Sequence, residues 1–299
     1  MWEERVKMRI TAKKKIEHEV YSLIPDIAYA SVPSWYGSTR RNLKMDILAP
    51  KVREGHEKCP LAVWFCGGAF RLMDKSVWIP EMMYFARKGY VVASVEYRTS
   101  NEVNFPEPLC DAKAAIRYLK AHAEEYCIDP DRICVMGESA GGSIASLVGM
   151  TGGIREYERG DYLEYDSKVQ AVIDFYGLVD MDLEVSGEPN DMIPPWTVQD
   201  YLGVLHTKED IRKASALSYV TEAVPPVMIL HGGADQAVSP MQSEKFYEKL
   251  QEKGVLSDLY LIEDAAHGDD AFYQDEVLAK VDEFLKKSIC TEKISRREQ

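Results

Sequence analysis

Residues 132–150, RICVMGESAGGSIASLVGM, contain the pattern that decides the fold. The apolar run at 132–137 predicts a buried strand, and the uncharged run at 143–150 predicts a helix. Between them stands Gly137-Glu138-Ser139-Ala140-Gly141, a G-x-S-x-G pattern. A sharp turn between strand and helix is the setting in which this pattern exposes a nucleophilic serine, and the glycines leave room for that turn. A plain glycine-rich turn is the alternative, but the flanking elements favour a nucleophile at Ser139.

On both sides of this segment, short apolar runs alternate with amphipathic helical patterns. This alternation predicts βαβ units on a mostly parallel sheet, and therefore an α/β fold. Strands are expected at 61–66, 90–95, 132–137, 169–176, 227–231 and 256–262, with two weaker strands at 27–32 and 43–48. Helices are expected at 106–126, 240–253 and 270–287. About eight strands result, of which the strand at 43–48 suits an antiparallel edge hairpin.

The 299 residues fit one large domain or two small ones, and the patterns favour one domain over residues 26–290. Residues 1–25 are expected to form an N-terminal arm, and 291–299 a polar tail. The irregular stretch at about 181–216 contains several prolines and acids, and its length is that of a small cap above the sheet.

The charge balance excludes some partners. Lys and Arg total 36 and Asp and Glu total 49, which gives a net charge of −13, so nucleic acid is not an expected partner. The longest uncharged stretch, 139–154, has 16 residues, which is too short for a membrane span, and the charged N-terminus lacks the apolar core of a signal peptide. The six cysteines form no C-x-x-C pair, and we expect buried free thiols in a cytoplasmic protein without a metal or cofactor.

A serine nucleophile needs a general base, for which histidine is best suited. In the chain order Ser–Asp–His, the base follows the last strand. His267 is the histidine that satisfies this order, with a surface-loop histidine as the alternative. His231 ends an earlier strand and is expected to order the loop that follows it.

The acid that orients the base is expected after the penultimate strand. Asp235 lies there, four residues past His231, behind two glycines that allow the loop to turn over the sheet edge. Asp264, Asp269 and Asp270 are competing acids close to the base in sequence, where loop solvation and helix capping are their ordinary roles.

Acyl transfer also needs donors for the developing oxyanion. The residue after the nucleophile, Ala140, supplies one backbone N–H. Others are expected from the loop Cys66-Gly67-Gly68-Ala69-Phe70, although two glycines after a strand also suit a plain turn.

Together these segments resemble the α/β-hydrolase superfamily, and within it the carboxylesterases of the hormone-sensitive-lipase-like and bifunctional feruloyl/acetyl-xylan-esterase types. The resemblance extends over WFCGGAF (64–70), VASVEYR (92–98), the stretch 105–142, VPPVMILHGGADQAVSP (224–240) and DAAHG (264–268). It implies Ser139 as nucleophile, Asp235 as acid and His267 as base, without a cofactor. It also implies Gly68, Ala69 and Ala140 as oxyanion donors.

One departure from the family pattern affects the oxyanion loop. The family usually begins this loop with His-Gly-Gly-Gly, whereas this chain has Cys66 in place of the histidine and Ala69 in place of the third glycine. Alanine supplies the same N–H as glycine provided that its φ is negative. The missing histidine removes a side chain that typically braces the loop.

Substrate contacts are expected from three aromatic residues, Trp78, Tyr176 and Trp196, although ordinary packing is the alternative for each. The cap contains no long apolar stretch, which favours short acyl esters over long-chain lipids. The resemblance suggests acetylated sugars or xylo-oligosaccharides as small-molecule substrates. An amide hydrolase such as an arylformamidase and a non-catalytic binding protein of the same fold are the alternatives.

Overall fold

The computed structural model describes residues 11–15, 19–34, 37–186 and 196–289. They contain one eight-stranded sheet with the order β1-β2-β4-β3-β5-β6-β7-β8. The strands are β1 (Tyr21–Pro33), β2 (Arg40–Pro50), β3 (Cys59–Phe65), β4 (Val91–Val95), β5 (Ile128–Glu138), β6 (Ala171–Phe175), β7 (Val227–Gly232) and β8 (Ser257–Ile262). The β1–β2 and β2–β4 pairs are antiparallel and the other pairs are parallel, which confirms the predicted fold class.

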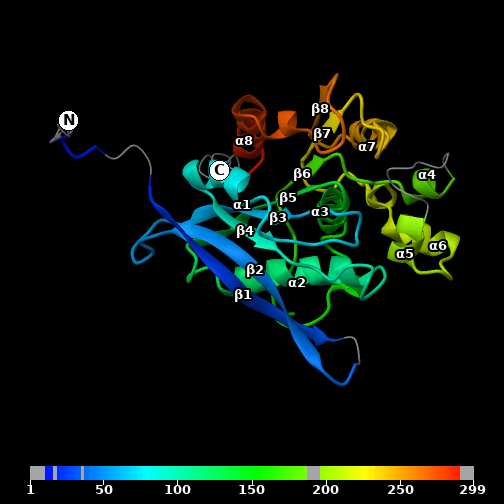
Figure 1. Cartoon of the computed structure of the whole chain (residues 1–299), viewed down its shortest axis with the longest axis horizontal. Helices are drawn as coiled ribbons and strands as arrows, with labels where there is room; N and C mark the ends of the chain where they lie inside the picture. The colour runs from blue at the N-terminus through cyan, green and yellow to red at the C-terminus, as the bar shows by residue number, and fades with distance from the viewer. Residues whose placement is uncertain (1–10, 16–18, 35–36, 187–195, 290–299) are drawn as a thin grey trace, which may run out of the picture.

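Helices cover both faces of this sheet (Figure 1). The main helices are α1 (Ile79–Arg87), α2 (Glu107–Ala121), α3 (Ala140–Met150), α7 (Met241–Glu252) and α8 (Asp275–Ile289). Apolar side chains of α1 and α8 share one core with the sheet, and those of α2, α3 and α7 share another. Among the described helices, none has the length and apolar character needed to cross a bilayer.

The predicted elements differ from the observed ones mainly at their ends. β1 begins at Tyr21, so it includes residues that were predicted to belong to the N-terminal arm. The predicted helix at 270–287 is divided into a short 3-10 turn, Asp270–Tyr273, and α8. Helix α1 was not predicted.

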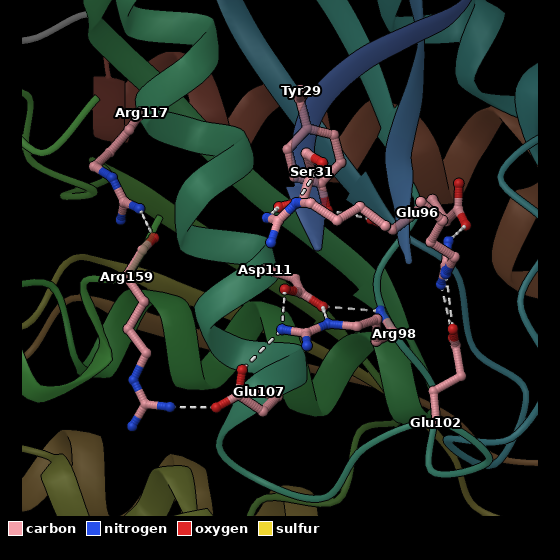
Figure 2. Close-up of polar contacts among 11 residues, drawn as sticks. Tyr29, Ser31, Glu96, Arg98, Glu102, Glu107, Asp111, Arg117 and Arg159 are labelled. Carbon is pink, nitrogen blue, oxygen red and sulfur yellow. Dashed lines mark hydrogen bonds and ion pairs between the residues drawn. The ribbon is translucent and has the colours of Figure 1, made fainter. Parts of the chain in front are cut away.

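Helix α2 is buried over residues 108–119, because its apolar side chains pack in one core with the sheet and the segment 151–168 contacts Lys113, Arg117 and Lys120. Its buried charges are therefore paired. Arg98, just after β4, donates from Nε and Nη2 to the two carboxylate oxygens of Asp111 at 2.8 and 2.7 Å, and from Nη2 to Glu107 at 2.8 Å (Figure 2). This bidentate pair fixes the start of α2 against the end of β4.

Three short helices lie between β6 and β7, in the stretch predicted to form a cap: α4 (Met181–Ser186), α5 (Trp196–Leu202) and α6 (Lys208–Ala214). Tyr201 of α5 stacks on Phe70, with ring centroids 4.0 Å apart. Asp200 forms an ion pair with Arg71 at 3.2 Å, so α5 is attached to the loop that follows β3.

Candidate active site

Ser139 lies on the turn between β5 and α3, and its backbone is strained. Its φ of +53° and ψ of −121° lie in a region that side chains other than glycine rarely occupy. The turn requires Gly141, because a Cβ there would stand 2.0 Å from the carbonyl oxygen of Phe65. The strained turn places Ser139 at the carboxyl edge of the sheet, where 6% of the residue is exposed.

His267 stands within hydrogen-bond distance of this hydroxyl. Its Nε2 is 2.9 Å from Ser139 Oγ, and its Nδ1 is 2.7 Å from Asp235 Oδ2. In the neutral ring, Nδ1–H donates to the carboxylate and Nε2 is free to accept the serine proton. The structure thus brings together the three residues that the sequence predicted as nucleophile, base and acid.

The carboxylate of Asp235 is surrounded by donors. Oδ1 accepts from the backbone N–H groups of Ala237 and Val238 at 2.8 and 2.9 Å. Oδ2 is shared by the two histidines His267 and His231. Burial alone would raise the pKa of Asp235, but the hydrogen bonds from His231, His267 and Val238 outweigh it and hold that pKa well below its usual range. The carboxylate is therefore charged at neutral pH.

His231 orders the loop that carries Asp235, as the sequence predicted. Its ring is fully buried, with Nδ1 at 2.6 Å from Ser243 Oγ. Its Nε2 lies 3.0 Å from the carbonyl oxygen of Val238 and 3.3 Å from Asp235 Oδ2. Because both are acceptors, Nε2 carries the proton and Nδ1 accepts from the serine hydroxyl.

The loop after β3 has an unusual backbone. Gly68, Ala69 and Phe70 have φ values of +125°, +53° and +59°. The condition that φ be negative at Ala69 is therefore not met, because the turn places three successive residues on the left-handed side. Within the described part of the chain, the N–H groups of Gly68, Ala69 and Ala140 donate to no acceptor, which leaves them available to a ligand.

Cys66, at the family's histidine position, is buried at the start of this loop. Its carbonyl oxygen accepts from the Tyr97 hydroxyl at 2.6 Å, and its Sγ lies 3.7 Å from Oε1 of Glu138. Glu138 was not among the predicted site residues. The only sequence signal was a carboxyl group beside the nucleophile, at a position that the G-x-S-x-G pattern leaves open.

The predicted substrate-contact residues have different surroundings. Tyr176 is fully buried, with its ring 4.9 Å from that of His267 and its hydroxyl 2.8 Å from that of Tyr273, so it supports the histidine and does not line a substrate surface. Trp78 is partly buried, stacks on Tyr273 at 4.2 Å and donates to Glu138 at 3.2 Å. Trp196 begins α5, but its side chain lies outside the described residues.

The five cysteines in the described ranges are all buried free thiols, as expected, and Cys290 lies outside those ranges. In the same ranges, no group of three or more His, Cys, Asp or Glu side chains could hold a metal ion.

Comparison with known proteins finds curated relatives that are named as carboxylic ester hydrolases or esterases. The probable carboxylic ester hydrolase LipM of Mycobacterium tuberculosis is 29% identical over 220 residues, which cover 73% of this chain and 51% of LipM. The chain spans about half the length of the curated relatives it matches.

Two solved esterase structures superpose over almost the whole chain. A truncated carbohydrate esterase from gut microbiota has a TM-score of 0.77 at 25% identity, with 93% of this chain and all of the other covered. The propionate-bound esterase Est2 of Thermogutta terrifontis has a TM-score of 0.72 at 26% identity, with 91% and 94% covered. The BD-FAE family model matches residues 45–250, and the chain, with its α/β-hydrolase fold, therefore belongs to the BD-FAE family.

Proposed function

We propose that this protein is a serine carboxylic-ester hydrolase that acts on short acyl esters. The observation that carries the proposal is the chain of hydrogen bonds from Ser139 Oγ through His267 to Asp235, at 2.9 and 2.7 Å, on a strained turn. A serine with its base and an oriented acid is the arrangement that nucleophilic acyl transfer needs.

In the proposed reaction, Ser139 Oγ attacks the ester carbonyl while its proton passes to His267 Nε2. Charged Asp235 stabilises the imidazolium that forms. The oxyanion is held by the N–H groups of Gly68, Ala69 and Ala140. Collapse breaks the bond to the alcohol, which leaves with the proton from His267, and an acyl-enzyme remains. Water then attacks the acyl-enzyme with His267 as base and releases the acid and free Ser139.

For the substrate, we propose acetylated sugars or xylo-oligosaccharides. One structural neighbour is a carbohydrate esterase and another was solved with bound propionate, a short acyl product. Trp78 is the aromatic side chain among the described predicted contacts that remains partly exposed, and we retain it as a candidate sugar contact.

Replacement of Ser139 by alanine tests the reaction. Turnover of p-nitrophenyl acetate is expected to fall about 10⁴-fold or more, since residual catalysis then rests on the oxyanion donors and binding alone. Labelling by a fluorophosphonate probe is expected in the wild type and absent in the variant. Unchanged turnover in the variant would overturn the proposal.

A substrate panel tests the specificity. We expect p-nitrophenyl acetate and acetylated xylo-oligosaccharides to be hydrolysed with higher kcat/KM than p-nitrophenyl octanoate or an N-formyl arylamine. A maximum at acyl chains of eight or more carbons would contradict the short-acyl assignment. A preference for the formamide would favour the amide-hydrolase alternative.

A further inference from the structure

The side chain of Glu138 lies against the oxyanion loop, although its own backbone belongs to β5. Its Oε1 accepts three hydrogen bonds: from the backbone N–H of Gly67, from Trp78 Nε1 at 3.2 Å and from Cys66 Sγ at 3.7 Å. The side chain is buried, with 9% of the residue exposed. All three donors belong to the loop after β3 or to the start of α1, so one oxygen atom holds both segments.

Four further hydrogen bonds hold this loop through its carbonyl groups. Tyr97 donates to the Cys66 carbonyl oxygen, the N–H groups of Arg71 and Leu72 donate to that of Gly68, and that of Ser100 donates to Phe70. Gly67 has the N–H immediately before the two proposed oxyanion donors of this loop. Glu138 is the group that fixes its direction, and it is also the residue immediately before Ser139.

We propose that Glu138 is a positioning residue of the oxyanion hole, which holds the Gly67–Ala69 backbone in place relative to the nucleophile. This inference rests on the proposed ester hydrolysis. The shared side chain joins the two halves of the hole, because Ala140 follows the nucleophile and Gly68 and Ala69 belong to the loop. It also explains how the loop is held without the family's histidine.

The carboxyl group of Glu138 is buried beside its donors, and two opposing effects act on its pKa. Burial raises the pKa of Glu138, and the hydrogen bonds from Gly67 and Trp78 offset only part of that effect. Burial also raises the pKa of Cys66 to about 12, so this residue is a thiol whose S–H donates a hydrogen bond to Glu138.

The contact between Glu138 and the loop also requires a glycine at position 67. A Cβ on Gly67 would stand 2.4 Å from Oε2 and 2.6 Å from Oε1 of Glu138. The acid can therefore approach the backbone of this loop only because the first of its two glycines has no side chain.

Two variants at one position test the proposal. Glu138→Gln keeps an acceptor oxygen of the same shape, whereas Glu138→Met keeps the volume without an acceptor. For p-nitrophenyl acetate we expect kcat of Glu138→Met to fall about 10- to 100-fold with KM within a factor of about two, because a donor moved out of place weakens transition-state binding alone. Glu138→Gln is expected to stay within about threefold of wild type.

A trifluoromethyl ketone, which forms a tetrahedral adduct with the serine, supplies a second readout. Its Ki is expected to rise in Glu138→Met by the same factor by which kcat/KM falls, with active sites counted by titration to correct for misfolded protein. Trp78→Phe and Cys66→Ala, which remove one donor each, are expected to give smaller losses in kcat.

The outcomes separate this inference from the proposed function. If Ser139→Ala abolishes turnover and correctly folded Glu138→Met retains full kcat and inhibitor affinity, the positioning role is wrong and the hydrolase proposal stands. If Trp78→Phe raises KM and leaves kcat unchanged, Trp78 is a substrate contact and takes no part in positioning. If Ser139→Ala is fully active, both proposals fail.

Discussion

The loop after β3, Cys66–Phe70, and the loop after β7, Gly233–Val238, begin alike, since each follows a buried strand and carries glycine near its start. Their interiors differ. In the loop after β7, every carboxylate oxygen of Asp235 has two partners, and the residues have ordinary φ values. In the loop after β3, three successive residues have positive φ and two N–H groups are without acceptors in the described chain.

The difference corresponds to the charge that each loop meets. The loop after β7 surrounds a permanent anion, so its donors are satisfied before any substrate binds. In the proposed reaction, the loop after β3 holds donors for an anion that exists only during turnover, and strain and contacts from outside the loop keep those donors in place. Hydrogen-bond donors are therefore preorganised in two ways at one edge of the sheet. Those around Asp235 already have an acceptor, whereas the N–H groups of Gly68 and Ala69 have none in the described chain.

The largest expected effect comes from loss of the carboxylate of Asp235 in the loop after β7. Asp235→Asn is expected to lower kcat about 10⁴-fold, because the amide cannot stabilise the imidazolium and favours the wrong tautomer of His267. Steady-state kinetics with p-nitrophenyl acetate measures the loss. Asp264→Asn, at a competing acid, is the matched control and should retain wild-type kcat. The reverse pattern would assign the acid to Asp264.

A buried acid with few donors sharpens the contrast with Asp235. Asp174 of β6 is fully buried, accepts from Gly177 N–H at 2.9 Å, and its Oδ2 has no hydrogen-bond partner in the described chain. Burial raises its pKa from 3.8 to about 6. Between these values the unfolded chain is deprotonated and the folded chain holds the proton, so stability falls as pH rises.

The expected loss at Asp174 is about 3 kcal/mol between pH 4 and pH 6, at about 1.4 kcal/mol per unit of pKa shift. Urea unfolding of wild type and Asp174→Asn across this range measures it. The free energy of unfolding of the wild type, minus that of the variant, should fall as pH rises and become constant above pH 6. A difference that does not depend on pH would show that Asp174 keeps an ordinary pKa. The pKa of Asp235 is lowered in the folded state, so its effect on the free energy of unfolding has the opposite sign, and stability is lost as pH falls.

Displacement of the N–H donors in the loop after β3 should lower kcat less than loss of the acid does. Gly68→Ala places a Cβ 2.4 Å from the carbonyl oxygen of Leu72 at a φ of +125°, so the loop must shift. We expect kcat to fall about 10²-fold with little change in KM, as for a misplaced oxyanion donor. Gly55→Ala is a control for strain alone, since φ there is +72° with nothing within 4 Å of the added Cβ. It should lose stability and keep full kcat, and an equal kcat loss in both would contradict the assignment.

The smallest effect is expected at Ala69. Its φ of +53° carries a penalty of about 1 kcal/mol that glycine does not have. Ala69→Gly is expected to raise the free energy of unfolding by up to about 1 kcal/mol and to leave kcat within about twofold. A clear loss of stability in urea unfolding would show that the loop is not strained at this residue.

The number of strands, their places along the chain and the positions of Ser139, Asp235 and His267 were predictable, because they depend on local patterns and on where successive parallel strands end. The role of Glu138 was not predictable, because the groups that donate to its carboxyl oxygen, on Gly67 and Trp78, lie 71 and 60 residues away in sequence. The burial of Tyr176 was missed for the same reason, since its partner Tyr273 lies 97 residues away. Helix α1 was missed because its nine residues are too short for a clear helical period.

The attachment of α5 to the loop after β3 has a consequence for protein engineering. The Phe70–Tyr201 stack and the Arg71–Asp200 ion pair join the predicted cap to the residues that flank Gly68 and Ala69. A cap transplanted from a relative would leave Phe70 without its stacking partner, next to backbone that is already strained. Chimeras of this protein should therefore exchange α5 and the loop after β3 as one unit, because a change in α5 also changes the contacts of the residues that flank the proposed oxyanion donors.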